Sequence, residues 1–374
     1  MNARQIGVFR GIPVKLHWGA VALAVLLGLL VANGVLPQLV PDLSDGAYLL
    51  GGFVAGIALL ASIFVHEASH ALVAQRYEIE VSSITLWLLG GVAHLEDEAP
   101  SPRAEARIAG AGPASSIGVA VVALVLGALI AGADVAPLVS AILFWVGGLN
   151  AILALFNLLP GAPLDGGRLL HAWLWKRHGD RTKATVGAAR AGRGLGIVIV
   201  ALGSADFLLG NLGGLWTALI GWFLYTAAGQ EAKSGRLSGV LHGRKLVDIM
   251  APLPPSIANW TMLRDVVSAG SASDRIVAVD FGGSVTAVAS RMDIVRATAR
   301  AAERNATLER LRDLPLPEPA ELHVDDPASA VLRHPGRPIV VFDEDRPVGL
   351  VTPVEVDRVM AMHHLEADEE AVAA

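Results

Sequence analysis

Residues 49–74 read LLGGFVAGIALLASIFVHEASHALVA, an apolar run that contains the pattern His66-Glu67-Ala68-Ser69-His70 near its end. The part before His66 carries no charge, and the whole run exceeds the roughly 20 residues that a helix needs to cross a bilayer. An ionisable residue at the centre of a span costs about 2.5–3.5 kcal/mol on insertion scales, so such residues usually mark function. The stretch therefore predicts a transmembrane helix that carries a functional site.

Further apolar runs of similar length lie on both sides of this one, at residues 18–35, 108–133, 139–159, 194–212 and 213–228. Hydrophobic residues make up 53% of the chain and charged residues only 17%, and the mean hydropathy is +0.53. Soluble domains carry about 25% charged residues. We therefore predict an α-helical polytopic membrane protein with about six transmembrane helices.

After residue 230 the apolar runs shorten to strand length, and Pro and Asp return. This change of composition predicts a membrane domain at residues 1–230, a linker at 231–242 and a soluble α/β domain at 243–374. Strand-like runs cover residues 276–279, 285–289, 338–342 and 348–351. They divide the tail into two similar halves, 243–300 and 306–362, each with a strand–helix–strand–strand–helix pattern.

The basic residues predict the orientation in the membrane. They gather before the first span, between residues 76 and 107, between 168 and 193, and at the start of the tail, whereas the loops between these segments carry none. Because cytoplasmic loops are enriched in Lys and Arg, we expect both termini in the cytoplasm. The first run has no convincing cleavage site, so we interpret it as a retained span and not as a signal peptide.

Composition also excludes several classes of site. The chain has no Cys, which rules out disulfides, Cys-ligated zinc and a thiol nucleophile. The net charge is −6 and no basic stripe is present, so the sequence gives no support for nucleic-acid binding. Only five of the 29 basic residues are Lys, which with the high Ala content hints at a bacterial chain.

The pattern at residues 66–70 is typical of a metal site. Residues four apart share one face of a helix, so the imidazoles of His66 and His70 can reach the same ion. Glu67 between them can act as general base on a metal-bound water. The alternative is a pair of helix-end histidines with a glutamate turned to the headgroups.

A catalytic zinc site needs a third protein ligand, and Asp165 is the best candidate. Asp165 follows a span that prolines break, and two glycines after it allow close backbone approach. Both the second and the fourth predicted spans run inward, so both sets of ligands lie in the cytoplasmic part of the membrane. They can therefore meet at one ion.

These residues resemble the site-2 protease family of intramembrane zinc metalloproteases. The resemblance rests on residues 66–70 and 157–167, which read HEASH and NLLPGAPLDGG, with support from residues 11–18 and 110–113. It implies one zinc ion per chain held by His66, His70 and Asp165, with Glu67 as catalytic base. It also implies that Asn157 helps to hold the substrate or the oxyanion; a helix-packing amide is the alternative. We expect packing for Asn150, and interfacial or surface positions for the remaining histidines of this half, His17, His94, His171 and His178.

The resemblance implies a function and leaves others open. It implies an endopeptidase that cleaves the transmembrane segment of a single-span protein, such as a membrane-bound regulator or anti-sigma factor, in regulated intramembrane proteolysis. Residues 79–94 alternate and then turn at glycines, so they predict strands near the site, either a platform for an unwound substrate or a structural hairpin. A metal-ion transporter with a regulatory tail and an inactive helix-binding scaffold are the alternatives.

The two halves of the tail resemble a tandem pair of CBS modules, which often bind adenosine-containing ligands. The ribose signature of that family matches Ser290-Arg291-Met292-Asp293 and Thr352-Pro353-Val354-Glu355, with Glu in place of the usual Asp in the second half. The resemblance implies nucleotide contacts from Asp293 and Glu355 and a homodimer through the paired modules. A dimerising or gating module without a ligand is the alternative, which we favour because fold alone does not give function.

Overall fold

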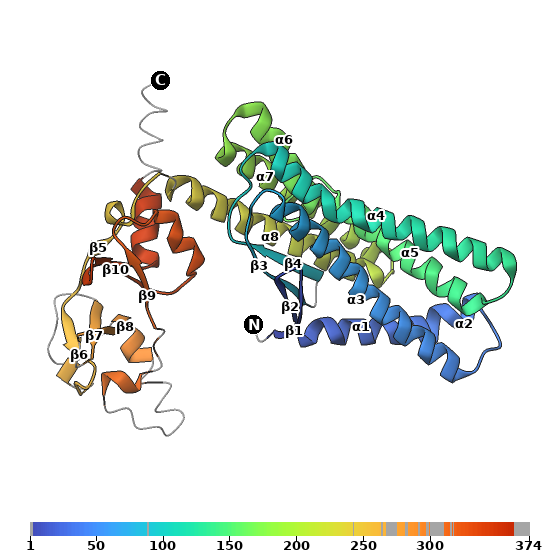
Figure 1. The fold of residues 1–374 in the computed structure, drawn as a ribbon, viewed down its shortest axis with the longest axis horizontal. Helices are drawn as coiled ribbons and strands as arrows, with labels where there is room; N and C mark the ends of the chain where they lie inside the picture. The colour runs from blue at the N-terminus through green and yellow to red at the C-terminus, as the bar shows by residue number, and fades with distance from the viewer. Residues whose placement is uncertain are drawn as a thin grey trace. The chain divides into compact units, whose positions relative to one another are not determined.

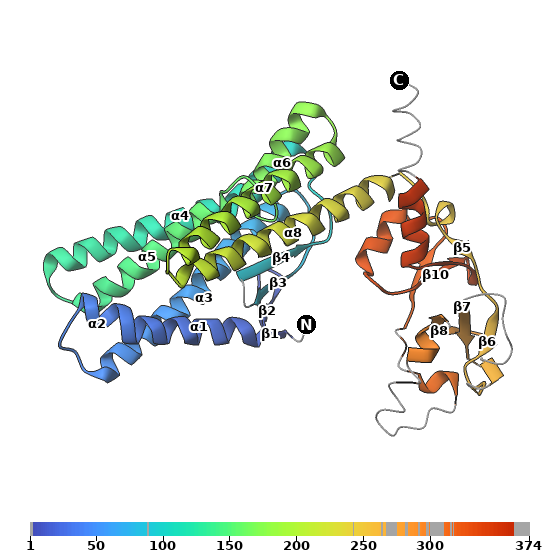
Figure 2. The same ribbon diagram turned by 180° about the vertical axis from the view of Figure 1, so that it is seen from behind.

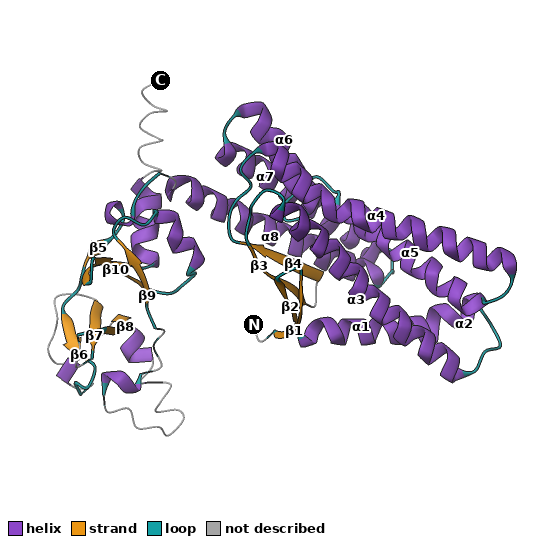
Figure 3. Cartoon of the chain, in the orientation of Figure 1, coloured by secondary structure: helices purple, strands orange, loops and turns teal. Residues whose placement is uncertain are grey.

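Long helices make up most of the N-terminal part of the chain (Figures 1 and 3). The computed structural model describes residues 3–87, 90–241, 243–262, 265–266, 275–280, 283–290, 292–296, 299, 310–314, 316 and 318–362. The chain divides into two compact units, Met1–Gly235 and Arg236–Ala374. The helices of the first unit are α1 (Trp18–Leu30), which continues through a π-helical turn (Val31–Val35) into α2 (Leu36–Leu39), then α3 (Asp45–Gln75), α4 (Pro102–Ala133), α5 (Pro137–Asn157), α6 (Asp165–His178), α7 (Arg181–Leu208) and α8 (Gly213–Leu241).

In the part of the chain that the structure describes, five helices are long and apolar enough to cross a membrane. They are the continuous stretch Trp18–Leu39 and helices α3, α4, α5 and α7. The sixth expected span lies within α8 but is not among these five. The physical reason is composition, since Gly, Thr, Trp and Tyr interrupt its apolar residues. The chain is therefore a multi-pass membrane protein with five candidate spans and an eighth helix of lower hydropathy.

A four-stranded sheet belongs to the same unit and lies at one end of the helices, beside the start of α1 (Figures 1 and 2). Its order is β1 (Arg4–Phe9), β2 (Ile12–Leu16), β3 (Val81–Trp87) and β4 (Gly90–Leu95). The strands expected within residues 79–94 are confirmed as β3 and β4. The sequence did not predict β1 and β2, which form a hairpin directly before the apolar run that begins at Trp18.

The core of this unit joins the sheet to the helices that carry the predicted ligands. Ile84 of β3 and Ile108 of α4 are fully buried, and both belong to one cluster with Ile63 and Ala71 of α3. Strand β4 forms one edge of the sheet, because it pairs only with β3 among the described strands. The packing therefore places this edge beside α3.

The tail consists of two halves with the same construction. In the first, β6 (Ser256–Ala258) pairs in parallel with β7 (Arg275–Val279), which pairs antiparallel with β8 (Val285–Ser290). In the second, β9 (Ala320–His323) pairs in parallel with β10 (Ile339–Asp343), which pairs antiparallel with β11 (Arg346–Val351), and β5 (Ala251–Pro252) adds to β11. Short 3-10 turns cover Leu246–Asp248, Leu311–Asp313 and Ala328–Arg333. The strands expected at 276–279, 285–289, 338–342 and 348–351 are confirmed as β7, β8, β10 and β11, whereas parts of both expected halves lie outside the described residues.

The expected linker at residues 231–242 differs from the structure. Helix α8 continues through it to Leu241, and Leu241 is 1% exposed within the core of the tail. The segment between Glu231 and Leu241 has no Pro, the residue that breaks a helix, although it holds two Gly and two Ser, so nothing in it ends α8. The sequence becomes more polar after residue 230, but the backbone remains helical as far as Leu241.

Candidate metal centre

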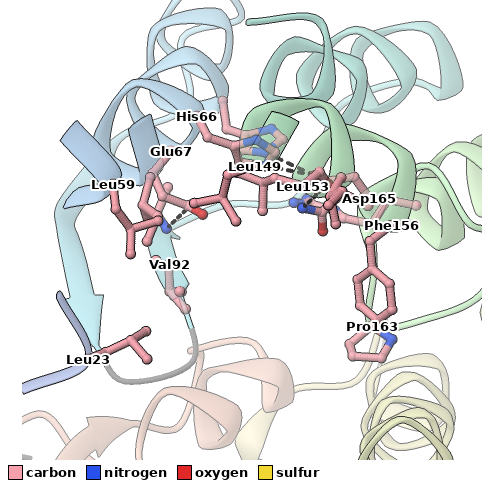
Figure 4. A pocket seen from close by; sticks show the side chains of 18 of the residues that line it. Leu23, Leu59, His66, Glu67, Val92, Leu149, Leu153, Phe156, Pro163 and Asp165 are labelled. Carbon is pink, nitrogen blue, oxygen red and sulfur yellow. Dashed lines mark hydrogen bonds and ion pairs between the residues drawn. The ribbon is translucent and has the colours of Figure 1, made fainter. Parts of the chain in front are cut away.

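Three side chains from two helices meet at one point. His66 and His70 lie one turn apart on α3, and Asp165 is the first residue of α6. Oδ2 of Asp165 lies 3.1 Å from Nε2 of His66 and 3.3 Å from Nε2 of His70. Figure 4 shows His66 and Asp165 together at the wall of a pocket, with Glu67 beside them. The predicted convergence of these residues is confirmed in geometry.

The spacing of the ligand atoms fits zinc. One ligand atom from each residue lies within 4.8 Å of the other two. Zinc binds His nitrogen and carboxylate oxygen at about 2.0–2.2 Å, so tetrahedral ligand atoms stand about 3.3 Å apart. Both distances from Asp165 Oδ2 are close to this value. Three protein ligands would leave the fourth position open, as in catalytic zinc sites.

Helix α4 holds the far side of both imidazoles. Oγ of Ser116 lies 2.9 Å from Nδ1 of His66, and the carbonyl oxygen of Ile108 lies 2.7 Å from Nδ1 of His70. With Nδ1 engaged in this way, Nε2 of each ring is directed to the metal position. His66 and His70 are only 4% and 5% exposed, so these contacts are shielded from water.

Gly112 explains how α4 approaches so closely. A Cβ atom at this position would lie 2.2 Å from Nε2 of His70 and 2.6 Å from Nε2 of His66. No side chain fits there while the two rings keep their positions. The glycine in the supporting motif at residues 110–113 therefore makes room for the ligands.

The charge of Asp165 suits a cation. Burial by itself would raise the pKa of this carboxyl group, but hydrogen bonds and charge from the rings of His66 and His70 outweigh burial and lower the pKa to about 2. Asp165 is therefore ionised at neutral pH. Gly166 behind it lies against the loop, since a Cβ there would be 2.4 Å from the carbonyl oxygen of Leu158, which confirms the expected close backbone approach.

Glu67 is held by strand β4. Its Oε2 accepts a hydrogen bond from the backbone N–H of Ala93 at 3.2 Å. Gly91 lies against the same side chain, and a Cβ at Gly91 would be 2.3 Å from Cγ of Glu67. The carboxylate is thus placed from outside its own helix, in contact with the edge of the sheet.

The ligands and Glu67 line a pocket of about 460 Å³. Its walls are mostly apolar, with contributions from Leu23 of α1, Leu59 of α3 and Phe156 of α5, as Figure 4 shows. Arg168, which the sequence interpretation did not single out, also lines it. An apolar pocket with a few convergent polar groups is the usual form of a ligand site.

Asn157 also lines this pocket. Its Nδ2 donates one hydrogen bond to the carbonyl oxygen of Leu153 in its own helix at 3.1 Å, and the amide has a second N–H and the acceptor Oδ1 besides. Asn150 behaves as expected for packing, because its Nδ2 donates to Oγ of Ser62 at 2.9 Å. Nothing in these contacts assigns Asn157 a role in the chemistry.

The expectation for His171 is wrong. This residue is 7% exposed and its Nδ1 lies 2.8 Å from Oε2 of Glu105. A lone histidine in an amphipathic segment gave no indication of burial, because its partner is distant in sequence. His17 caps α1, where its Nδ1 accepts a hydrogen bond from the backbone N–H of Gly19.

The two carboxylates of the tail are engaged by their own loops. Oδ2 of Asp293 accepts hydrogen bonds from Oγ and the backbone N–H of Ser290. Glu355 accepts the equivalent pair from Thr352, and both of its oxygens lie 2.8 Å from Nη1 of Arg275. Burial would raise the pKa of Glu355, but these hydrogen bonds from Thr352 and Arg275 lower it overall. Arg291 of the first signature lies outside the described residues.

These features define a class: a helical membrane protein with a buried site of two histidines and one carboxylate next to a glutamate. The family model described as Peptidase family M50 matches residues 54–137 and 129–201. The chain is 36% identical to the putative zinc metalloprotease Rip3 of Mycobacterium tuberculosis, over 98% of this chain and 95% of that protein. The chain therefore belongs to peptidase family M50, and the predicted metalloprotease of the site-2 protease type is confirmed at the level of the family.

Solved structures resemble each unit separately. A site-2 protease from Methanocaldococcus jannaschii is 28% identical and covers 62% of this chain and 95% of its own, with a TM-score of 0.42. The CBS domain pair of protein MJ0100, in complex with 5'-methylthioadenosine and S-adenosyl-L-methionine, is 18% identical and covers 31% of this chain and 99% of its own, with a TM-score of 0.26.

Proposed function

We propose that this protein is a zinc endopeptidase that cleaves membrane-embedded segments of other proteins. One observation carries the proposal: the rings of His66 and His70 and the carboxylate of Asp165 meet beside Glu67 in an apolar pocket. The ligand residues come from a helix that is apolar enough to span a membrane and from the start of α6. Membership of peptidase family M50 supports the same chemistry.

Each residue of the pocket has its own role in the proposed peptide hydrolysis. Zinc, when bound by His66, His70 and Asp165, supplies a Lewis acid that acidifies water and polarises a peptide carbonyl. Glu67 takes the proton from the attacking water and delivers it to the leaving amine. Ser116 and Ile108 keep the two rings oriented, and the N–H of Ala93 keeps the Glu67 carboxylate in place. Asn157 lines the pocket with a free acceptor oxygen, which suits a contact with substrate N–H groups.

The edge of the sheet supports a role in substrate binding. A peptide bond in a helix is shielded by its own hydrogen bonds, so the substrate must unwind before cleavage. Strand β4 is an edge strand, and its residues Gly90–Ala93 line the pocket beside Glu67. An unwound segment that pairs with β4 would place its backbone next to the carboxylate. We therefore take β4 as the platform, with single-span membrane proteins, including membrane-bound regulators, as the substrate class.

The proposed orientation of the chain in the membrane rests on the basic residues and on the need for water at the site. Arg168, Lys176 and Arg177 follow Asp165 on α6, and cytoplasmic loops are rich in such residues. We therefore place Asp165, the metal and both termini on the cytoplasmic side of a bacterial cell membrane. Water reaches a site near that face without crossing the bilayer.

For the tail we propose a dimerising or gating module. Glu355 is 2% exposed and accepts hydrogen bonds from Thr352 and Arg275, so its carboxylate is already engaged. Contacts of Asp293 and Glu355 with an adenosine nucleotide are the alternative. Calorimetry with ATP, AMP and S-adenosylmethionine separates the two, since heat of binding from any of them would favour the sensor.

The test of the protease is the variant Glu67→Gln. It is expected to retain zinc and to lose cleavage of a model single-span substrate in detergent or proteoliposomes. Asp165→Asn is the matched variant for the metal and is expected to lose zinc during purification. Continued cleavage by Glu67→Gln would exclude the proposed mechanism, and zinc flux into proteoliposomes that disappears in His66→Ala would indicate a transporter instead.

A further inference from the structure

A second buried polar cluster lies outside the pocket and has no part in the chemistry above. Glu105 in the first turn of α4 is 6% exposed, and His171 in the middle of α6 is 7% exposed. Oε2 of Glu105 lies 2.8 Å from Nδ1 of His171. The pair thus joins the helix that supports the two ligand histidines to the helix that begins with the third ligand.

The other side of the His171 ring extends the link to α7. Nε2 lies 3.1 Å from Oγ1 of Thr185 and 3.3 Å from the carbonyl oxygen of Arg181. The Thr185 hydroxyl also lies 3.1 Å from that carbonyl oxygen, so Nε2 shares a small polar cluster with two oxygens of α7. A single imidazole therefore connects α4, α6 and α7 with every ring nitrogen engaged.

Helix α4 uses one face for all of these contacts. Glu105, Ile108, Gly112 and Ser116 follow one another at intervals of three, four and four residues, which places them in one stripe. Ile108 and Ser116 hold the histidines, and Gly112 lies directly against their rings. The same stripe, through Glu105, holds α6. One face of α4 therefore contacts His66 and His70 directly, and through Glu105 it also contacts α6, the helix that begins with Asp165.

We infer that the Glu105–His171 pair is a positioning device that sets Asp165 at the metal. Asp165 begins α6, and His171 lies six residues later in the same short helix. Rotation of α6 by one residue would swing Asp165 by about 100° around the helix axis. The bond from Glu105 fixes both the rotation and the height of α6 against α4, and so keeps Oδ2 within reach of both Nε2 atoms. This inference rests on the assignment of the zinc ligands in the proposed function.

The placement of Asp165 explains the Glu105–His171 pair better than a contribution to folding stability does. Buried ion pairs often contribute little net stability, because the cost of removing both groups from water offsets their attraction. A pair kept for geometry should therefore affect the metal more than the folded state. Loss of a direct hydrogen-bond partner of a metal ligand typically weakens metal binding by about 10–100-fold, and this sets the scale of the effect expected here.

The experiment measures zinc binding without measuring cleavage. Zinc affinity is determined by chelator competition for the full-length protein and for Glu105→Ala and His171→Ala, and Co²⁺ substitution reports the ligand geometry through its visible spectrum. Each variant is expected to bind zinc about 10–100-fold more weakly and to show an altered Co²⁺ spectrum. Glu105→Gln keeps an acceptor oxygen and is expected to bind more tightly than Glu105→Ala.

Ser140→Ala is the matched control. It removes a buried hydrogen bond between helices, from Oγ of Ser140 to the carbonyl oxygen of Gly127 at 3.0 Å, near the other end of α4. It is expected to bind zinc like the unmodified protein. Unchanged affinity and spectrum in Glu105→Ala and His171→Ala, or an equal loss in Ser140→Ala, would overturn the inference. If Asp165→Asn itself binds zinc normally, the ligand assignment fails instead, so the two failures are distinguishable.

Discussion

Ser116 on α4 lies 2.9 Å from Nδ1 of His66, although the two residues are 50 positions apart in the chain. Both are buried, with Ser116 only 1% exposed. The hydroxyl therefore works as a fixed partner that orients the ring and leaves Nε2 for the metal. A contact of this kind belongs to the candidate metal centre although Ser116 is not one of its three proposed ligands.

The first prediction concerns this contact. Ser116→Ala should weaken zinc binding by about tenfold, because loss of an outer partner frees the His66 ring to turn. Chelator competition measures the change. Ser115→Ala is the control, since Oγ of Ser115 donates to the carbonyl oxygen of Gly112 and contacts neither ring. Equal affinities in the two variants would contradict the role given to Ser116.

A second prediction concerns the space beside the rings. Gly112→Ala should abolish zinc retention, because the added Cβ would lie 2.2 Å from Nε2 of His70. The measurement is the zinc content of purified protein. Gly118→Ala on the same helix is matched in helix propensity and meets nothing within 4 Å, so it should retain the metal. Full zinc content in Gly112→Ala would mean that α4 does not pack as described.

The third prediction distinguishes the role of Glu67 as general base from the binding of zinc. Gly91→Ala would place a Cβ 2.3 Å from Cγ of Glu67 and displace that side chain, and the three atoms nearest to this Cβ all belong to Glu67. We expect cleavage of a model substrate to fall at least about 100-fold, a typical contribution of a general base, with zinc content unchanged. Gly34→Ala, with nothing within 4 Å, serves as the control. Normal cleavage by Gly91→Ala would argue against the placement of Glu67.

A fourth prediction concerns the pH dependence of the tail. The folded tail lowers the pKa of Glu355, so the folded state favours the ionised form. The resulting stability is present above the unfolded pKa, about 4.3, and is lost as the pH falls through the lower folded value. The urea midpoint of the tail should therefore be constant between about pH 7 and 5 and fall below about pH 4.

Glu355→Gln tests the source of that dependence. Loss of the carboxylate should lower the stability of the tail by about 2 kcal/mol at pH 7, because the buried contacts to Arg275 and Thr352 are weakened. The unfolding midpoint is measured in the full-length protein from exchange-labelled peptides that cover β10 and β11. A variant that keeps the acid-induced loss unchanged would show that other groups cause it.

Much of the architecture follows from local sequence patterns. The apolar runs predicted α3, α4, α5 and α7 because span length and hydropathy are properties of a single segment. They did not predict β1 and β2: β2 joins the sheet by pairing with β3, about 70 positions away, and β1 pairs with β2. Polarity alone also predicted a linker where α8 continues to Leu241.

The sequence by itself identified the three residues of the candidate metal centre, His66, His70 and Asp165. The spacing of His66 and His70 brings two rings to one face of a helix, and the prolines and glycines around Asp165 leave a carboxylate at the start of another. These are local consequences of helix geometry and backbone freedom.

Only the tertiary structure decided what holds those ligands in place. Ser116, Ile108 and Ala93 contact the site from 26 to 50 residues away, and Glu105 reaches His171 across 66 residues. Nothing in the local sequence of these partners indicates which distant side chain each one contacts. Their roles arise because α4 and β4 pack against α3 and α6, and such packing depends on the shape of the whole unit.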